Sequence, residues 1–407
     1  MKCRLCAATV THPFLDLGTA PPSNAYLTAE DLQRPEPTFP LRVKVCARCW
    51  LVQTEDFADA QALFSPQYAY FSATSSSWLK HSEAFVAAAV ERFHLNDRSM
   101  VAEVAANDGY LLQYVKARGI PCYGIEPTAS TAAAARTRGI DIVEGFLTEA
   151  LGRSLAADGR QADLVIANNV LAHVPDLPGF TRGIAALLKP EGVASFEFPH
   201  LLRLLEGDQF DTIYHEHFSY LSLGAVTRLF ADTGLKTVDV EELPTHGGSL
   251  RVTAALTGSA HVPTPAPARI LTAERAGGLQ ELATYAAFQS RADTIARATL
   301  AYLEDASGQG LKVAAYGAAA KGNTLLNYAG VGADLIAMVA DKSPGKIGRH
   351  LPGSYIPIVA PETLLAARPD RILILPWNIA PEIAAELQPA RAWGARFVTA
   401  VPRILEF

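Results

Sequence analysis

From about residue 97 the sequence repeats one unit, in which a short apolar run is followed by a tight turn and a helical pattern. The apolar runs occur in SMVAEV, PCYGIE, GIDIVE, ADLVIAN and EGVASFEF, and each has the length of a buried strand. Strands that alternate with helices predict a parallel, doubly wound sheet. Ligands in such sheets bind at the carboxyl ends of the strands, so we expect a site at that edge.

The pattern changes twice along the 407 residues, which are more than one ordinary domain holds. Residues 1–65 are loop-rich and carry two CxxC pairs, and residues 66–260 hold the strand-helix repeat. Residues 261–407 begin with a proline-rich linker at 261–270 and a long helical pattern at 271–306, and a second doubly wound unit follows. The sequence therefore predicts an α/β protein in three parts.

Four of the five cysteines form the two pairs, Cys3 with Cys6 and Cys46 with Cys49. The N-terminus lacks the apolar core of a signal peptide, so we expect a cytoplasmic protein with reduced cysteines. Two CxxC pairs then predict a tetrahedral Zn²⁺ site with four sulfur ligands. Four thiolates leave no open coordination position, which favours a structural zinc over a catalytic or redox site.

The composition and net charge argue against some classes of binding partner. Hydrophobic residues make up 49% and charged residues 19%, which is typical of a globular protein with a sizeable core. The net charge is −6 and no strong basic stripe is visible, which argues against nucleic acid. No apolar run approaches the roughly 18 residues of a membrane span. We expect a monomeric or weakly associating protein.

The loop after the first central strand has the chemistry of a nucleoside site. Ala105, Asn107, Asp108 and Gly109 form a tight turn whose small residues let a ligand approach the backbone. Glu126, about 20 residues beyond the turn at the end of the next strand, is placed to accept hydrogen bonds from a ribose. The loop lacks GxGxxG and a nearby cation, which argues against a pyrophosphate. S-adenosylmethionine fits best, and another nucleotide is the alternative.

Further residues are expected around the same ligand. Pro127 follows the ribose-binding acid, and Asn168 and Asn169 end the fourth strand at the same edge of the sheet. The segment QYAYFSATSSSW, residues 67–78, mixes aromatic and hydroxyl residues. It can cover the methyl donor with Tyr68, Tyr70 and Ser72, although an ordinary packed connector has the same composition.

Seven motifs follow the CxxC pairs in order, namely EVAANDGYLLQ, GIEPT, NNVLAHVPDL, YHEHFSYLS, HGGSLRV, YGAAAKGNTLLNY and ILPWN. Together they resemble the S-adenosylmethionine-dependent C-methyltransferases of deoxysugar biosynthesis over essentially the whole chain. The resemblance implies a zinc-binding N-terminal module, a central Rossmann-like methyltransferase domain and a C-terminal α/β domain that helps to hold the substrate. It implies that the substrate is a nucleotide-linked 4-keto sugar, most often dTDP-linked with GDP as the other candidate. The favoured methylation position is C-3′, with C-5′ as the alternative.

The segment YHEH, residues 214–217, suits proton transfer. Methylation of a carbon beside a ketone requires removal of an α-proton, for which histidine is the usual base. A metal site would need more ligands than are evident nearby, and a purely structural turn is the other alternative. On an extended segment His215 and His217 share one face, so the pattern does not separate them. The resemblance places the functional residues at Tyr214, Glu216 and His217, with His217 as the base.

Three residues are candidates for contact with the sugar. Asn169 and His173 are four positions apart at the expected start of a helix, which puts them on one face. The resemblance places both near the sugar, whereas a helix cap and a surface histidine would be the structural alternative. His246 is a further candidate because the glycines after it allow close approach of a ligand.

The C-terminal unit offers a cradle for a diphosphate. The turn GAAAKGN, residues 317–323, combines a helix N-terminus with a lysine. Lys321 and Asn323 are expected at the diphosphate, with Tyr316 and Asn378 beside them. A purely structural second domain is the alternative.

The sequence thus predicts a sugar C-methyltransferase in which His217 abstracts a proton and the enolate takes the methyl group. One alternative is a nicotinamide-dependent sugar-nucleotide oxidoreductase that uses the C-terminal unit. The other is a non-catalytic zinc-ribbon scaffold. Neither explains an acid at residue 126 together with the tyrosine-histidine cluster.

Overall fold

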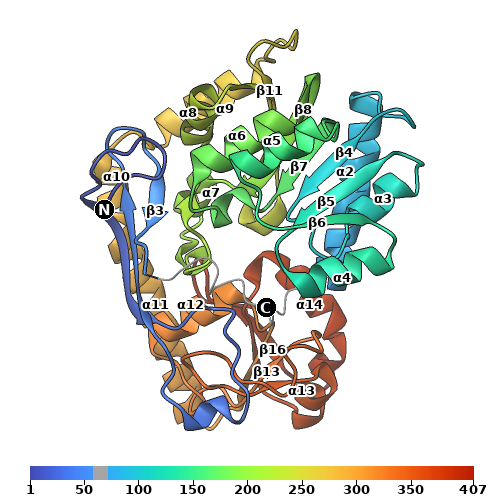
Figure 1. The fold of residues 1–407 in the computed structure, drawn as a ribbon. Helices are drawn as coiled ribbons and strands as arrows, with labels where there is room; N and C mark the ends of the chain where they lie inside the picture. The colour runs from blue at the N-terminus through green and yellow to red at the C-terminus, as the bar shows by residue number, and fades with distance from the viewer. Residues whose placement is uncertain (58–71) are drawn as a thin grey trace.

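The predicted repeat forms a seven-stranded sheet in the order β10-β11-β8-β7-β4-β5-β6 (Figure 1). The computed structural model describes residues 1–57 and 72–407. The strands are β4 (Val101–Val104), β5 (Cys122–Glu126), β6 (Asp141–Glu144), β7 (Ala162–Asn168), β8 (Leu188–Pro199), β10 (Leu235–Leu243) and β11 (Ser249–Leu256). Strands β4 to β8 run parallel, and β11 is antiparallel to both of its neighbours. The central strands β4 and β7 are buried, as the apolar runs predict.

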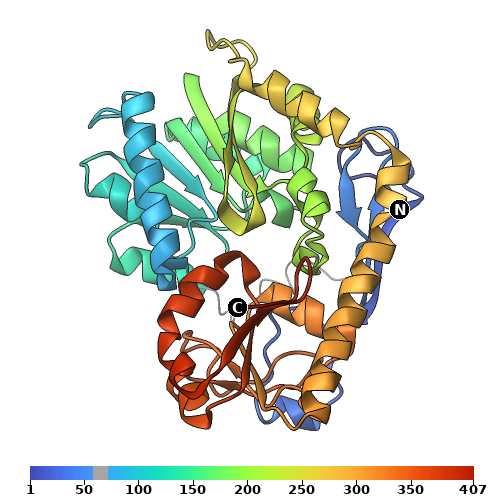
Figure 2. The same ribbon diagram turned by 180° about the vertical axis from the view of Figure 1, so that it is seen from behind.

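Helices cover both faces of this sheet (Figures 1 and 2). They are α2 (Ser76–Arg92), α3 (Leu112–Lys116), α4 (Ala129–Thr137), α5 (Glu149–Ala157), α6 (Leu177–Leu187) and α8 (Leu223–Asp232). The short helix α7 (Leu201–Glu206) follows β8 and packs in the apolar cluster that also contains residues of the N-terminal module. The strand order reverses between β4 and β7, because β5 and β6 lie on one side of β4 and β7 and β8 on the other. Such a switch point leaves a crevice at the carboxyl ends of the strands, where ligands bind.

The N-terminal module is an antiparallel sheet that a later segment completes. Its strands are β1 (His12–Ala20), β2 (Phe39–Val45), β3 (Val52–Thr54) and β9 (Ser219–Tyr220). The sheet has the order β1-β2-β3-β9, so the fourth strand comes from the central part of the chain. The N-terminal module is therefore joined to the methyltransferase-like sheet by backbone pairing.

The helical pattern at 271–306 forms three helices, not one. They are α9 (Ala266–Ala276), α10 (Leu282–Ala286) and α11 (Phe288–Gly308). The break follows Ala276, where Gly278 has a positive φ of 75°, a conformation that glycine adopts at little cost. The proline-rich stretch expected as a linker already contains the start of α9, because prolines suit the first turn of a helix. Figure 2 shows α11 running along the side of the molecule towards the C-terminal unit.

The C-terminal unit is the second doubly wound sheet, as predicted. Its strands are β12 (Val313–Tyr316), β13 (Val339–Ala340), β14 (Ile358–Val359), β15 (Arg371–Ile374), β16 (Arg396–Thr399) and β17 (Leu405–Glu406). Its helices are α12 (Ala320–Ala329), α13 (Pro361–Ala367) and α14 (Ala380–Glu386). The strand order is β14-β13-β12-β15-β16-β17, and it again reverses direction beside β12, the first strand of the unit in the chain. The N-terminus of α12 therefore lies at a second switch point.

Candidate active site

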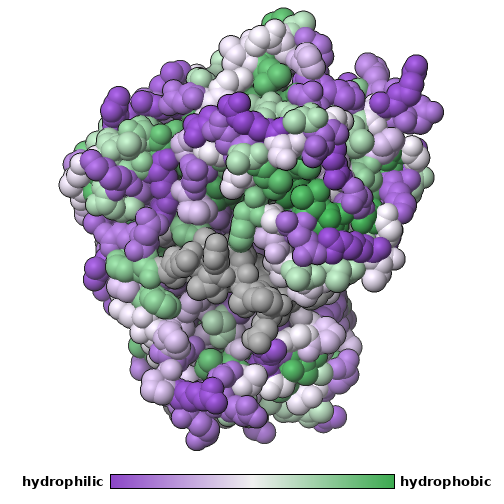
Figure 3. All heavy atoms as spheres, in the orientation of Figure 1, coloured by the Kyte–Doolittle hydropathy of each residue, from purple (hydrophilic) through white to green (hydrophobic). Residues whose placement is uncertain are grey.

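A cavity of about 630 Å³ lies between the carboxyl edge of the central sheet and the start of α12. On the face seen in Figure 1, hydrophobic residues gather in the middle of the central domain with hydrophilic residues around them (Figure 3). The predicted site residues that line the cavity are Ser72, Ala105, Asn107, Glu126, Pro127, Asn168, Asn169, His173, Tyr214, His217, His246 and Lys321. The predicted methyl-donor and sugar residues therefore share one space.

The loop after β4 uses an uncommon backbone conformation. Ala105, Asn107 and Gly109 have φ values of 56°, 48° and 78°. Only glycine adopts this region freely, so the alanine and the asparagine are strained. The side chains hold the loop in place, because the Asn107 amide donates to Glu126 Oε2 at 2.9 Å and its own Oδ1 accepts from the Ser72 amide at 3.0 Å. The sharp turn brings the backbone to the cavity wall.

Two residues of this loop do not line the cavity, contrary to the prediction that they contact the methyl donor. Asp108 is turned inward, where Oδ2 accepts from the Ala73 amide at 3.2 Å and pairs with Arg138 at 3.4 Å. Gly109 serves the packing, because a Cβ there would meet Ile140 Cγ1 at 3.2 Å. Tyr68 and Tyr70 lie outside the described residues.

The end of β7 carries buried groups that fit a ligand. The side-chain oxygens of Asn168 and Asn169 are buried and accept no hydrogen bond from the described part of the chain. Buried acceptors of this kind are normally satisfied, so they suit a ligand that brings donors such as an amine. Asn169 has a φ of 53°, and its amide donates to the Glu197 carbonyl at 2.6 Å. These observations agree with S-adenosylmethionine at the switch point.

The expected helix at Asn169 does not start there. A 3₁₀ turn, Leu171–His173, follows the left-handed asparagine, so the two predicted sugar residues do not share the face of an α-helix. Both nevertheless line the cavity. His173 Nδ1 donates to the Glu216 carbonyl at 2.6 Å, and burial lowers the pKa of this histidine to about 4. His246 also lines the cavity at a φ of 56°, and its Nε2 lies 3.5 Å from Asn169 Nδ2.

The YHEH segment forms a tight turn, not the extended strand considered above. The His217 amide donates to the Tyr214 carbonyl at 3.0 Å, which closes the turn. The turn sends the two histidines apart. His217 lines the cavity, whereas His215 Nε2 lies 3.2 Å from the Phe39 carbonyl of β2. The geometry thus separates two residues that the pattern leaves equivalent.

The imidazole of His217 is held in one tautomer. Nδ1 donates to the Thr212 carbonyl at 3.1 Å, which leaves Nε2 to accept from the Tyr214 hydroxyl at 2.8 Å. Burial, helped by the nearby His173, keeps the pKa of His217 well below its usual value. The ring is therefore uncharged at neutral pH and has a lone pair on Nε2.

Glu216 does not touch this imidazole, although the resemblance places it among the functional residues beside His217. Its side chain points to the N-terminal module, where Oε1 accepts from the Asn24 amide and from Asn24 Nδ2, both at 3.1 Å. Burial raises the pKa of Glu216. The Thr212 carbonyl orients the histidine instead.

Of the residues predicted to bind the diphosphate, Lys321 lines the cavity, on the side formed by the C-terminal unit. Lys321 Nζ lies 4.5 Å above the ring of Trp377 and donates to Asn378 Oδ1 at 2.7 Å. The Trp377 indole in turn donates to Asp211 Oδ2 at 2.7 Å, and burial raises the pKa of that acid to about 6. Asn378 therefore acts on Lys321 and does not line the cavity among the described residues.

Two of the predicted diphosphate residues lie elsewhere. Asn323 is fully buried one turn into α12, and its Nδ2 donates to the Ser23 carbonyl at 2.6 Å. Tyr316 packs into the apolar cluster between the sheet and its helices. Their short distance along the chain from Lys321 suggested a shared site, but the helix and the strand turn both side chains away.

Several cavity residues were not predicted from the sequence. They are Asn24, Trp78, Tyr110, Phe146, Thr212 and Lys346. Phe146 follows β6, so its position at the carboxyl edge was a usable signal. Asn24 and Lys346 come from loops far away in the chain, and no local pattern marks them.

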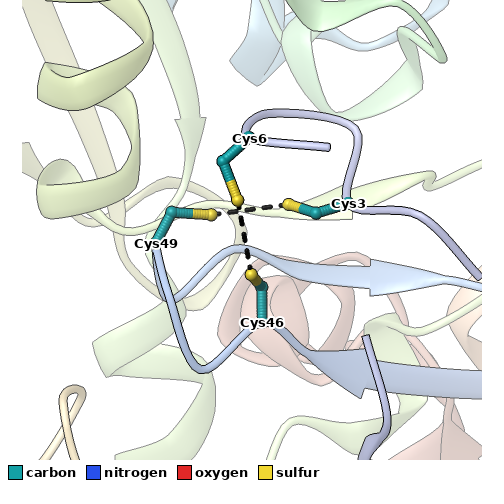
Figure 4. A group of neighbouring side chains, drawn as sticks. All are labelled: Cys3, Cys6, Cys46 and Cys49. Atoms are coloured by element: carbon teal, nitrogen blue, oxygen red, sulfur yellow. Dashed lines mark hydrogen bonds between the residues drawn. The ribbon is translucent and has the colours of Figure 1, made fainter. Parts of the chain in front are cut away.

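The four paired cysteines converge on one point (Figure 4). Their sulfur atoms all lie within 4.8 Å of one another, with Cys3 and Cys49 at 3.4 Å and Cys6 and Cys46 at 3.6 Å. A tetrahedron of sulfurs at about 2.3 Å from a zinc ion has edges of similar length. A hydrogen bond from Cys49 lowers the pKa of Cys3 to about 5, so one thiolate is already favoured. The set fits Zn²⁺ as a closed structural site.

The comparisons with known proteins cover the whole length. Residues 3–64 match the family "Putative zinc binding domain", residues 78–240 a "Methyltransferase domain", and residues 244–402 the "C-methyltransferase C-terminal domain". The chain is 36% identical to the C-methyltransferase NovU of Streptomyces niveus, over 98% of this chain and 95% of that protein.

Two solved structures each match less than half of the chain. Magnesium protoporphyrin IX methyltransferase of Synechocystis PCC 6803 has 15% identity and a TM-score of 0.36, over 44% of this chain and 83% of that chain. The PH0226 protein of Pyrococcus horikoshii has 15% identity and a TM-score of 0.39, over 46% and 95%. Likeness at this level bears on neither substrate nor mechanism.

The fold and the cavity define an S-adenosylmethionine-dependent methyltransferase with a zinc-binding module at its N-terminus. The chain belongs to the C-methyltransferase family that includes NovU. Within residues 1–57 and 72–407, no helix has the length and apolar character that a membrane crossing requires.

Proposed function

We propose that the protein methylates C-3′ of a nucleotide-linked 4-keto deoxysugar, with dTDP as the favoured nucleotide. The observation that carries this proposal is the state of His217, an uncharged imidazole with its Nε2 at the wall of the cavity. Bound S-adenosylmethionine supplies an electrophilic methyl group. A carbon becomes nucleophilic beside a ketone only after its proton is removed, and the cavity has a base suited to that step.

We assign a separate role to each residue around the proposed base. His217 Nε2 takes the proton from C-3′, and the electrons of that bond form the enolate with the 4-keto oxygen. The Tyr214 hydroxyl, now 2.8 Å from Nε2, donates to the enolate oxygen as charge develops there. The enolate carbon would then accept the methyl group that bound S-adenosylmethionine supplies, and the electrons of the broken methyl–sulfur bond would remain on sulfur. The Thr212 carbonyl keeps Nδ1 protonated throughout.

Lys321 is proposed to hold the diphosphate of the sugar nucleotide. It is one of two lysines of the C-terminal unit that line the cavity, and burial lowers its pKa. An anionic ligand would stabilise its charged form. The indole of Trp377 and the amide of Asn378 fix its position.

The experiment that tests the proposal compares the wild type with His217→Asn and His215→Asn on a dTDP-4-keto-2,6-dideoxyhexose in heavy water. Mass spectrometry follows both methyl gain and deuterium uptake. Loss of the base should lower both by about 10²-fold or more, with donor binding kept. His215→Asn is the matched control and should keep most of the turnover. Near-normal turnover in His217→Asn would show that another group is the base.

A further inference from the structure

The turn that carries His217 leads directly into the sheet of the zinc module. Strand β9 begins at Ser219, two residues after the histidine, and pairs with β3 through Gln53 and Val52. Phe218 alone separates the histidine from this ladder. Any shift of β3 moves Phe218 with it.

Side chains of the zinc module form hydrogen bonds to the backbone of His217 and Phe218. Thr54 Oγ1 lies 3.3 Å from the His217 carbonyl and 3.4 Å from the Phe218 carbonyl, and donates to them. The Phe218 carbonyl also accepts from Arg4 Nη1 at 2.8 Å, and the same nitrogen donates to the Thr54 carbonyl at 2.9 Å. The carbonyl groups on both sides of the Phe218 amide are therefore bound to the N-terminal module.

Arg4 itself is fixed by the metal-binding knuckle. It stands between the ligands Cys3 and Cys6, and its amide donates to Gln53 Oε1 at 2.9 Å. Its side chain is buried, with 6% of its surface exposed, and its guanidinium lies 5.2 Å from the centre of the Phe218 ring. The outer nitrogen pairs with Asp56, which is exposed. An uninterrupted set of contacts thus joins the cysteine knuckle to the backbone of the proposed base.

We propose that Thr54 and Arg4 are positioning residues for His217, and that the zinc module serves as the support of the catalytic turn. This inference rests on the proposed role of His217 as the base. Neither residue lines the cavity among the described residues, so neither is expected to contact a substrate. Their effect passes through the backbone, where a small misplacement of a base is costly in rate.

The test is a double-mutant cycle between Thr54→Val and His217→Asn, read by transfer of a labelled methyl group. Valine keeps the shape of threonine and removes the hydroxyl. We expect Thr54→Val to lower kcat roughly five- to tenfold, the equivalent of about one hydrogen bond, with KM and zinc content unchanged. In the His217→Asn background the same change should have no further effect, because the group that it positions is gone.

Two control variants separate positioning from general stability. Thr233 is a buried threonine at the end of α8 whose hydroxyl also bonds to backbone carbonyls, so Thr233→Val should lower stability and leave kcat unchanged. Asp56→Asn removes only the exposed partner of Arg4 and should leave kcat unchanged. Arg4→Lys removes the guanidinium that donates to the Thr54 and Phe218 carbonyls, so it should lower kcat as Thr54→Val does.

The outcomes are distinct. An unchanged kcat in Thr54→Val overturns the inference whatever the role of the histidine. Equal losses in both backgrounds overturn it as well, because they would mean that Thr54 acts independently of His217. Normal turnover in His217→Asn alone would instead reject the proposed base.

Discussion

At the scale of single residues, the surroundings of each histidine determine its protonation state and whether it reaches the cavity. Two histidines two positions apart in the sequence have different surroundings, because one faces the cavity and the other faces a strand of the zinc module. The buried His217 is uncharged at neutral pH, and a carbonyl group fixes which nitrogen carries the proton. Because the Thr212 carbonyl already orients the proposed base, that role needs no carboxylate, and Glu216 instead accepts hydrogen bonds from Asn24.

The pH dependence of turnover follows from this. The pKa of His217 is lowered below its ordinary value of 6.5, and the active form is the uncharged one that predominates above the pKa. Activity is therefore lost only as the pH falls through the lowered value. We expect kcat/KM to stay constant as the pH falls from neutral to below 6.5, and to decline only at a still lower pH. An acid limb at or above 6.5, in protein that is still folded at that pH, would contradict the assignment.

At this scale the sequence indicates which residues reach the cavity when they directly follow a strand, but not when their partners are distant along the chain. Glu126 and Asn168 line the cavity because the carboxyl ends of parallel strands meet at one edge. Asn323 is close to Lys321 in the chain, but the helix turns it to the core. Asn24 reaches the site from the zinc module, a position that only the assembled fold defines.

At the scale of elements, the loop between β4 and α3 combines an unusual backbone with small side chains. The sequence predicted the loop and its approach to a ligand. It did not reveal that Ala105 and Asn107 take the conformation for which glycine is normally used. Contacts with Glu126 and Ser72 hold the loop against this strain.

Ala105→Gly should therefore stabilise the protein by about 1 kcal/mol, because it relieves the left-handed strain. The matched control is Ala106→Gly at the next position, which is fully buried and does not have a positive φ. It should instead lower stability by a similar amount or more, since it deletes a packed methyl group. Denaturant midpoints measure both changes, and a loss of stability in Ala105→Gly would show that the strain is not released.

At the scale of the whole molecule, the three parts share their cores. One apolar cluster contains Phe14 of the N-terminal module, Phe210 of the central part and Leu325 of the C-terminal unit. Another contains Cys3 and Cys46 together with Phe196 of β8. The domains visible in the sequence are therefore not independent packing units, which a pattern read along the chain does not reveal.

Removal of the metal should accordingly affect the entire protein. We expect about one zinc ion per chain, lost in Cys49→Ser and kept in Cys122→Ser, because Cys122 is not part of the cluster. Chelation should lower the midpoint of the single calorimetric transition by roughly 10 °C, since structural zinc sites contribute folding free energy. A separate early transition with the main peak unmoved would show that the module unfolds alone.

The strand order of the N-terminal sheet also has a consequence for how the protein is made. Strand β3 leaves the ribosome with the first residues, but its neighbour β9 starts only at Ser219. At ordinary speeds of translation this leaves one edge of the nascent sheet open for on the order of ten seconds. An open edge invites pairing with other chains, so the growing polypeptide needs protection during that interval. All four zinc-ligand cysteines are likewise synthesised well before the turn at 214–217 that their module is proposed to support.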